Sequence, residues 1–299
     1  MGTTTFSGPV RSENQFKLIS KDSTTGLISD RTQSGDAAHD TRRYYLYESF
    51  LQRPALNAVA SAPLTDADAT AAANDAIIVA RAIASRNFEV LGTNMTTALC
   101  TFNATSAGIV LTTATADEDQ AILAPHLDTN QSAWQVTKWG TENQVDWECS
   151  INPNAIDNQK LWAGLKLTND QLVATDDDQA YFKFQTDAAN SEAFTDFTKL
   201  HFVHSIGGTD FISQLPITVA ANTIYHLRIQ INSARQAAIF VNGIQYNVTS
   251  TSGSTGGTAV TTGTTRTGDL IPYVGIEAGA AAAEAVGVHY QSISRVIFE

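Results

Sequence analysis

Three polar residues at alternate positions, Gln144, Asp146 and Glu148, form the pattern with the most chemical potential in this chain. Alternate side chains of a β-strand point to the same face, so the three would lie side by side. Retaining glycoside hydrolysis needs two carboxylates in a fixed relation, one as nucleophile and one as general acid. The amide of Gln144 cannot act as a carboxylate nucleophile. We therefore interpret Asp146 and Glu148 as polar residues on the solvated face of a strand whose other face is apolar, with Trp147 and Cys149.

A second acidic group lies at residues 176–178, where three aspartates follow one another, with Asp170 upstream. Calcium takes about six to eight oxygen ligands, which carboxylates can supply. The spacing differs from that of an EF-hand loop, and consecutive side chains point in different directions. We interpret Asp176, Asp177 and Asp178 as a solvated turn before the strand at residues 179–185, and we expect no metal site.

The histidines and the large aromatic residues offer weaker chemistry. His201 and His204 are close enough in sequence to suggest a zinc-binding pair, but no further ligand lies nearby, so metal binding is not expected. Exposed aromatic rings on a concave sheet would form a sugar-stacking platform, whereas aromatic residues at alternating positions are more often part of the core. The core interpretation is favoured for Trp134, Trp139, Trp147, Trp162, Tyr181 and Phe182.

Composition excludes several classes of function. The chain has 299 residues, of which 43% are hydrophobic and 16% charged, and its formal net charge is −12. Nucleic-acid binding needs clustered Lys and Arg, and the sequence has no such cluster, so no nucleic-acid partner is expected. It also lacks a G-x-S-x-G motif, a phosphate-binding loop and a dinucleotide fingerprint. We therefore predict a protein that is not an enzyme, with no catalytic residues and no cofactor.

Neither secretion nor membrane insertion is indicated by the sequence. No apolar run reaches the length of about 18 residues that a spanning helix needs, and no signal-peptide core is present, so no membrane partner is expected. Cys100 and Cys149 lie in apolar alternating segments, which favours two buried free thiols and leaves a disulfide open.

Residues 223–248 indicate the fold class most clearly. Their first part, residues 225–231, alternates apolar and polar side chains, the period of a strand with one buried face. Two further strands meet across Asn242-Gly243, and Asn-Gly favours the type I′ hairpin turn because both of its central residues need positive φ.

Short strand patterns recur along the rest of the chain and predict an all-β sandwich or jelly roll. They lie at residues 44–51, 88–91, 98–104, 108–113, 120–124, 145–151, 161–167, 179–185, 271–277 and 286–298. Residues 65–86 are predicted as a short helix that Thr65 would cap. Residues 249–268 are of low complexity and are predicted as a long mobile surface loop.

The chain divides into residues 1–43 and a predicted sandwich domain of residues 44–299. The first part has only isolated apolar residues in a polar background, too few to bury a core. Two interpretations stay open for it: an extended arm that adds strands to a neighbouring surface, and an unstructured terminus. Within it, residues 16–20 and 27–29 flank a turn and could pair as a small hairpin.

One segment resembles a known fold family. TIYHLRIQINSARQAAIFVNG, residues 223–243, resembles the strand-turn-strand of concanavalin A-like (laminin G-like) jelly rolls, which ends in an apolar residue and Asn-Gly. The spacing at Gln144 similarly resembles the E-x-D-x-E of jelly-roll glycoside hydrolases, without its first carboxylate. The likeness implies a concanavalin A-like sandwich, but the departure at Gln144 puts inherited sugar chemistry in doubt.

A second resemblance spans most of the chain. The opening MGTTTFSGPVRSEN and the segments NFEVLGTN, ILAPHLDTNQSAW, WGTENQVDWEC, WAGLKLTN, ATDDDQAYF and DLIPYVGIEA resemble virion structural proteins of marine tailed phages, especially those that infect cyanobacteria. This likeness implies a capsid decoration, cement or knob protein, made in the bacterial host cytoplasm and located on the capsid surface of the virion.

The resemblance also implies partners. Expected are the phage major capsid protein or other virion proteins, with a homo-oligomer or many copies on each particle. The alternative is a carbohydrate-binding tail-fibre or host-adhesion module that binds a host-surface glycan. In the first case the arm would bind the capsid through its apolar residues Phe6, Pro9, Val10, Phe16, Leu18 and Ile19.

Overall fold

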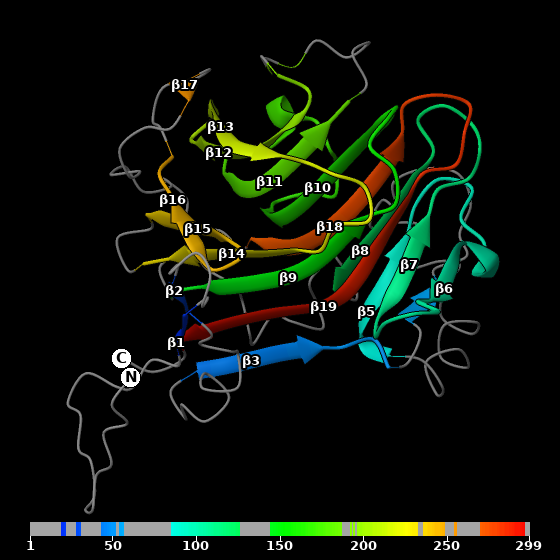
Figure 1. Ribbon diagram of the computed structural model, residues 1–299, viewed down its shortest axis with the longest axis horizontal. Coiled ribbons are helices and arrows are strands. Elements are labelled where there is room, and N and C mark those ends of the chain that lie inside the picture. The colour runs from blue at the N-terminus through cyan, green and yellow to red at the C-terminus, as the bar shows by residue number, and fades with distance from the viewer. Residues whose placement is uncertain are drawn as a thin grey trace, which may run out of the picture.

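Short strands, the element type that the sequence predicts, make up most of the regular structure in this chain (Figure 1). A computed structural model describes residues 19–21, 28–30, 43–51, 54–56, 85–125, 144–186, 192, 194, 196–232, 236–248, 254–255 and 270–296. Their strands form a nine-stranded sheet, an eight-stranded sheet and a two-stranded hairpin.

The nine-stranded sheet combines strands from the whole length of the chain. Its order is β17 (Ser254–Thr255), β13 (Thr209–Thr218), β12 (Lys199–Ile206), β11 (Gln179–Gln185), β10 (Gln159–Lys166), β18 (Ile271–Ala278), β8 (Gln120–Pro125), β5 (Ser85–Leu91) and β4 (Pro54–Leu56). Its pairs are antiparallel, apart from β13 with β17 and β4 with β5.

The eight-stranded sheet is antiparallel throughout. Its order is β16 (Ile244–Tyr246), β15 (Ala237–Val241), β14 (Tyr225–Ile231), β9 (Asp146–Pro153), β19 (Ala285–Val296), β7 (Ile109–Thr112) and β6 (Cys100–Phe102). The eighth strand, β3 (Arg43–Glu48), pairs with the second half of the long β19, whose first half pairs with β7. The remaining elements are the hairpin strands β1 (Ile19–Lys21) and β2 (Ile28–Asp30) and the 3₁₀ turns η1 (Thr97–Leu99) and η4 (Val173–Thr175).

Consecutive strands repeatedly cross from one sheet to the other. The crossings β7 to β8, β9 to β10, β13 to β14 and β18 to β19 wrap the chain around the space between the sheets. Two large, mainly antiparallel sheets joined in this way make a jelly-roll sandwich. The predicted all-β, concanavalin A-like fold class is confirmed by this arrangement.

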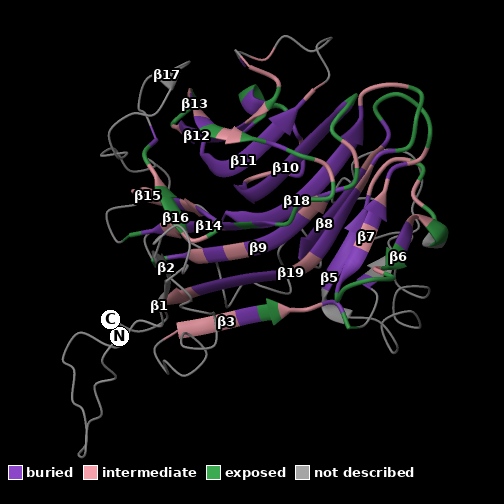
Figure 2. Ribbon diagram, in the orientation of Figure 1, coloured by how far each residue is buried: buried purple, intermediate pink, exposed green. Residues whose placement is uncertain are grey.

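A hydrophobic core fills the space between the sheets, because each strand turns alternate side chains inward. In β14, Leu227, Ile229 and Ile231 are buried in this core. His226, the second residue of the strand, points to the other face and is exposed. Trp147 of β9 lies fully buried in the same cluster. Figure 2 shows buried residues running along the strands of both sheets. Burying each such side chain contributes roughly 1.5–3 kcal/mol.

A second apolar cluster lies on the other face of the nine-stranded sheet. On β10, Leu161 and Ala163 belong to the core between the sheets, whereas Trp162 belongs to this outer cluster. The indole of Trp162 lies across Gly275 of β18, where a Cβ would come within 2.2 Å of Cζ2. Glycine is therefore the residue that lets the two strands and the indole pack together.

The hairpins predicted at residues 223–248 are confirmed. Val241 pairs with Ile244 across Asn242-Gly243, whose φ angles are 52° and 78°. Both values are positive, as a type I′ turn requires. The side-chain oxygen of Asn242 accepts a hydrogen bond from the backbone N of His226 at 2.9 Å, which ties the turn to β14.

Several local predictions need correction. β5 begins at Ser85, so a helix over residues 65–86 cannot extend to its predicted end, and residues 57–84 lie outside the described part of the chain. The predicted loop of residues 249–268 contains β17, which pairs in parallel with β13. β12 was not predicted, because six of its residues are buried on both faces and give no apolar-polar alternation.

The predicted arm has one described element. β1 pairs antiparallel with β2, with Ser20 opposite Ser29, so the predicted small hairpin is confirmed. Arg43, the last residue of the predicted arm, is the first residue of β3 and pairs with Val296 of β19.

Candidate functional site

The polar side chains of β9 lie on the face of the eight-stranded sheet that points away from the core. Asp146 and Glu148 are partly exposed there, while Trp147 and Cys149 are buried on the core side. The predicted alternation of this strand is confirmed. Gln144, however, precedes the strand and has a left-handed backbone with φ 52°, so the expectation that it continues the row of Asp146 and Glu148 is wrong.

Arg228 of β14 binds both of these carboxylates. Its Nε donates to Oδ1 of Asp146 at 2.9 Å, and its Nη2 donates to Oδ2 at 2.6 Å. Nε also lies 3.2 Å from Oε1 of Glu148. Gln230 adds a hydrogen bond from Nε2 to Oδ2 of Asp146 at 3.1 Å. One guanidinium therefore contacts both carboxylates, and it holds Asp146 at two points as a hydrogen-bond acceptor on the sheet surface.

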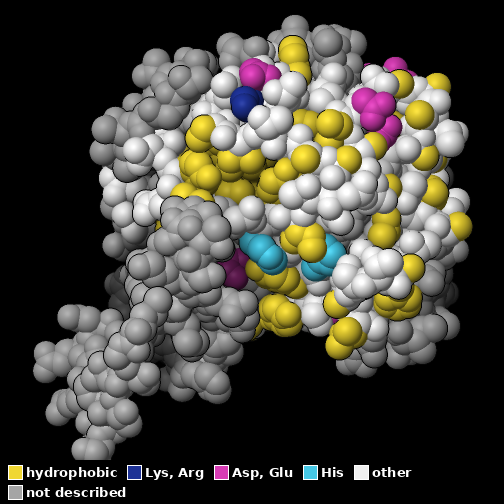
Figure 3. All heavy atoms as spheres, in the orientation of Figure 1, with side chains coloured by type: hydrophobic (Ala, Val, Ile, Leu, Met, Phe, Trp, Pro, Cys, Tyr) yellow, Lys and Arg dark blue, Asp and Glu magenta, His cyan; other side chains and the backbone are white. Residues whose placement is uncertain are grey.

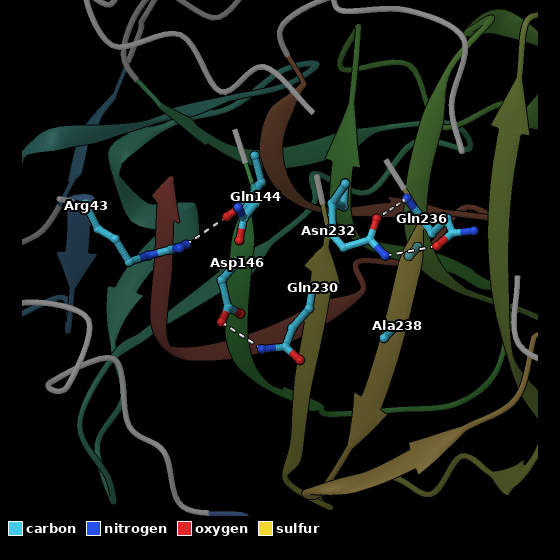
Figure 4. Close-up of a pocket in the computed structure, with 10 residues that line it drawn as sticks. Arg43, Gln144, Asp146, Gln230, Asn232, Gln236 and Ala238 are labelled. Atoms are coloured by element: carbon cyan, nitrogen blue, oxygen red, sulfur yellow. Dashed lines mark hydrogen bonds between the residues drawn. The ribbon is translucent and has the colours of Figure 1, made fainter. Parts of the chain in front are cut away.

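A polar pocket opens at the end of this sheet, where β9 and β15 begin and β14 ends (Figure 4). Its volume is about 390 Å³. Four of the lining side chains are amides and two are charged. The lining residues are Arg43, Gln144, Val145, Asp146, Gln230, Ile231, Asn232, Gln236, Ala237 and Ala238.

Hydrogen bonds hold the pocket walls in place. Nη2 of Arg43 donates to the carbonyl oxygen of Gln144 at 2.8 Å and to Oγ of Ser294 at 2.8 Å, which joins β3 and β19 to the start of β9. On the opposite wall, Nδ2 of Asn232 donates to Oε1 of Gln236 at 2.9 Å, and the backbone N of Gln236 donates to Oδ1 of Asn232 at 2.9 Å (Figure 4). The pocket can offer preset amide donors and acceptors to a polar ligand.

A row of aromatic rings crosses the same face. Tyr45 and Tyr47 of β3 stack with ring centroids 6.3 Å apart, and Tyr47 stacks on Tyr290 of β19 at 6.0 Å. His226 of β14 continues the row, 6.2 Å from Tyr290. The Tyr47 side chain is 45% exposed. We call Tyr45, Tyr47, Tyr290 and His226 the aromatic row. Figure 3 shows histidine and hydrophobic side chains close together on the visible face of the molecule.

Burial and neighbouring charges shift the pKa of two members of this row. Burial, followed by the nearby Glu148 carboxylate, raises the pKa of the Tyr290 hydroxyl far above its usual value. Burial lowers the pKa of His226, and the neighbouring His289 adds to that shift. Both shifts favour the neutral form, so the row presents uncharged rings near neutral pH.

The outer face of the nine-stranded sheet carries buried lysines, each matched to an acid. Lys160 pairs with Glu277, Lys183 pairs with Glu192, and Lys166 lies 3.1 Å from Asp176. Burial lowers the pKa of Lys183 to about 8, although the Glu192 carboxylate opposes this.

The Lys166 and Lys183 pairs join the strands to the segments around η4 and residue 192, which cover the sheet, whereas the Lys160 pair joins β10 to β18.

The prediction of a solvated turn at residues 176–178 is wrong for two of the three aspartates. Asp176 is 3% exposed and accepts hydrogen bonds from the backbone N of Leu167 and of Thr168 at 3.1 and 3.2 Å. Asp178 is 1% exposed and accepts from the backbone N of Gly207. The backbone amides replace water as partners of these two carboxylates, which makes their burial tolerable, whereas Asp177 is exposed.

His201 and His204 lie three residues apart on β12 and therefore on opposite faces of it. The ring of His201 packs edge-on against Phe194 with centroids 4.5 Å apart, and that of His204 stacks on Phe211 at 4.9 Å. Burial lowers the pKa of each to about 4. This geometry does not let the two imidazoles share a metal ion.

The core interpretation of the aromatic residues is confirmed where they are described. Trp147, Trp162, Tyr181 and Phe182 are at most 1% exposed. Trp134 and Trp139 lie outside the described residues. Cys100 and Cys149 are buried and are not joined by a disulfide, and burial raises the pKa of the Cys149 thiol well above its usual value.

Of the predicted capsid-binding residues, Ile19 is the one that the structure describes. Ile19 lies in β1, where its backbone pairs with Asp30. The others, Phe6, Pro9, Val10, Phe16 and Leu18, lie outside the described residues.

Sequence reasoning did not single out Arg228 or the tyrosines of the aromatic row as site residues. The alternation of residues 225–231 places Arg228 on the solvated face, and the spacing of Tyr45 and Tyr47 places both on one face of β3. These two patterns were the sequence signals from which the site residues could have been found. The sequence does not show which strands lie side by side, because the paired strands can be far apart in the chain. Arg228 and Asp146, for example, are separated by 82 residues.

Comparisons with known proteins give likeness of fold only. No protein-family model matches the chain, and no curated protein matches it. A solved structure of a protein of unknown function from Shewanella oneidensis aligns with 85% of this chain and 86% of its own, at 8% identity and a TM-score of 0.46. A family 16 glycosyl hydrolase from Mycobacterium smegmatis aligns with 83% of this chain and 98% of its own, at 12% identity and a TM-score of 0.44.

An alginate lyase from Corynebacterium aligns with 67% of this chain and 82% of its own, at 12% identity and a TM-score of 0.42. The fold assignment therefore depends on the strand order and register of this chain.

Among the described residues, no helix has the length and apolar character needed to span a bilayer.

Proposed function

We propose that this chain is a non-enzymatic virion structural protein of a tailed phage, a decoration, cement or knob protein of the capsid. Its support is the segment resemblance from MGTTTFSGPVRSEN to DLIPYVGIEA, which spans most of the sequence. In this proposal residues 1–43 bind the outer shell and the jelly roll is displayed outward. Such a protein stabilises a particle by adding interface area between shell subunits, which needs many copies and no chemistry.

The observation that carries the non-enzymatic part is the pairing of Arg228 with Asp146 and Glu148. A hydrolytic pair needs one carboxylate open to the substrate and one able to give a proton. Here the same guanidinium binds both, and the sequence has an amide, Gln144, in place of a further carboxylate. This arrangement favours a surface that binds over one that catalyses.

In this proposal the arm attaches to the shell by strand addition. In its β1–β2 hairpin, residues 19–21 and 28–30 adopt extended, paired backbone. Extended segments attach to neighbouring subunits by adding main-chain hydrogen bonds at a sheet edge, while apolar side chains give register and specificity. Phe6, Phe16 and Leu18 are apolar side chains of this segment that could supply such contacts.

The test is co-sedimentation of the full chain with undecorated shells of a marine tailed phage. Replacing Phe6, Phe16 and Leu18 together by Asp should abolish binding, as should deletion of residues 1–40, while circular dichroism stays that of a folded β protein. Leu51→Asp is the matched control, because Leu51 is apolar, 76% exposed and outside the arm. Retained shell binding by the arm variants contradicts the proposal. Antibody labelling of intact particles then separates capsid from tail.

A second candidate function is a carbohydrate-binding module of a tail fibre or host adhesin. It is favoured by the aromatic row, whose rings lie beside polar side chains on the outer face of the eight-stranded sheet. A host-surface glycan would be the ligand. Particles that lose host adsorption when the aromatic row is mutated, with shell binding unchanged, would favour this candidate over the first.

A glycoside hydrolase is the weakest candidate. Release of reducing sugar from a β-glucan that disappears in Glu148→Gln would revive it, since Glu148 is the residue left in the general-acid position.

A further inference from the structure

We propose that the pocket at the start of β9, together with the aromatic row, forms a binding site for a neutral oligosaccharide. The proposal deepens the second candidate function, because it assigns that activity to one surface and one chemical class of ligand. This surface is the outer face of the eight-stranded sheet. The outer face of the nine-stranded sheet lies on the other side of the sandwich, and segments held by the Lys166 and Lys183 ion pairs cover it.

The lining of the pocket matches hydroxyl groups. Gln144, Gln230, Asn232 and Gln236 each carry an amide with two donor hydrogens and an acceptor oxygen. A sugar hydroxyl also donates one hydrogen bond and accepts others, so amides and hydroxyls can pair in either direction. The internal bonds of Asn232 with Gln236 and of Gln230 with Asp146 fix three of these four amides before a ligand arrives, which lowers the entropic cost of binding.

The charges around the pocket favour a neutral ligand. The charged lining residues are one cation, Arg43, and one anion, Asp146. Asp146 is bound by Arg228, whose other carboxylate partner is Glu148. The lining therefore carries one charge of each sign, and Arg228 holds the two acids Asp146 and Glu148. An anionic polymer would have to displace these acids from Arg228, and a cationic ligand would have to displace the guanidinium, whereas a neutral ligand leaves the cluster intact.

The aromatic row lies close enough to the pocket to share one ligand. Asp146 of β9 pairs with Ser294 of β19, and Ser294 pairs with Tyr45 of β3, so two strand spacings of about 4.8 Å separate the pocket from the first ring. Tyr45, Tyr47 and Tyr290 then continue away from the pocket. Flat, uncharged rings present apolar faces to the C–H faces of sugar rings, while neighbouring polar groups bind hydroxyls.

The test is isothermal titration of the full chain with three neutral hexasaccharides, cellohexaose, maltohexaose and xylohexaose, and with an oligogalacturonate as the anionic probe. We expect at least one neutral hexasaccharide to bind in the micromolar to millimolar range and the anionic probe to bind more weakly. Tyr47→Ala and Gln230→Met should each weaken that binding at least fivefold.

Two variants serve as matched controls and should leave the affinity unchanged. Phe102→Ala removes an aromatic ring of similar exposure, 49%, on β6, and Gln245→Met removes an exposed amide on β16. Thermal melts establish that all variants are folded. The proposal is overturned if no neutral hexasaccharide binds, if the anionic probe binds more tightly, or if the site variants bind like the controls. The shell co-sedimentation assay is independent of these results, so failure here and failure of the capsid proposal are told apart.

Discussion

The guanidinium of Arg228 binds both carboxylate oxygens of Asp146, with Nε 2.9 Å from Oδ1 and Nη2 2.6 Å from Oδ2. The two side chains are only 16% and 24% exposed, so this is a partly desolvated, two-point ion pair between neighbouring strands. Such pairs orient their members more strongly than single contacts between exposed charges do. Asp146 is consequently a fixed part of the sheet surface and of the pocket wall.

Breaking this pair should destabilise the sandwich. Arg228→Met should lower the free energy of unfolding by about 1.5–3 kcal/mol, because two partly buried carboxylates lose charge-assisted hydrogen bonds. Urea denaturation measures the change. In a double-mutant cycle with Asp146→Asn we expect a coupling energy of about 0.5–3 kcal/mol. A coupling energy near zero would mean that the two side chains do not interact in solution.

The contact between Trp162 and Gly275 gives a second prediction. Gly275→Ala should destabilise the protein by about 1–3 kcal/mol, because the added Cβ would lie 2.2 Å from the indole and must displace it. Gly287→Ala is the matched control on β19, where the nearest atom would lie at 3.4 Å. Adding Trp162→Phe to Gly275→Ala should recover part of the loss. Equal unfolding free energies for the two glycine variants would contradict the packing.

Stability should fall with acid through the titration of His201 and His204. Burial lowers the pKa of each from 6.5 to about 4 in the folded chain. Between these values the unfolded chain protonates both imidazoles while the folded chain does not, so the unfolded state binds more protons. The free energy of unfolding therefore falls as pH is lowered from 6.5 towards 4, by at most roughly 3 kcal/mol per histidine.

Urea denaturation at several pH values tests this dependence. The variant His201→Gln with His204→Gln should show a flatter dependence between pH 6.5 and 4 than the wild type. His289→Gln, a partly exposed residue, controls for the loss of an imidazole elsewhere. A double variant whose pH dependence equals that of the wild type would mean that both buried histidines titrate normally.

The thiols should be protected by the fold. Cys100 and Cys149 are buried and are not joined by a disulfide, and burial raises the pKa of Cys149. Because the thiolate is the reactive form, we expect almost no reaction with Ellman's reagent in the native state and release of two equivalents after unfolding in denaturant. Unfolded protein without free thiols would instead indicate a disulfide.

Much of the fold could be predicted because strand periodicity is a local property. The alternation in β14 and the Asn242-Gly243 turn gave the hairpins correctly, since a two-residue turn fixes the register of its own strands. β12 escaped prediction because burial on both faces removes the alternation. The burial of Asp176 escaped it because a partner that makes burial tolerable, Lys166, lies on β10, whereas Asp176 follows η4.

The sequence by itself determined which side chains of each strand face solvent: Asp146 and Glu148 on β9, and Arg228 on β14. Only the tertiary structure decided that β14 pairs with β9 in the register that sets Arg228 opposite Glu148, and that β19 brings Tyr290 beside Tyr47. The physical reason is that register across distant strands is set by packing of the shared core, a sum over many buried contacts that no short segment contains.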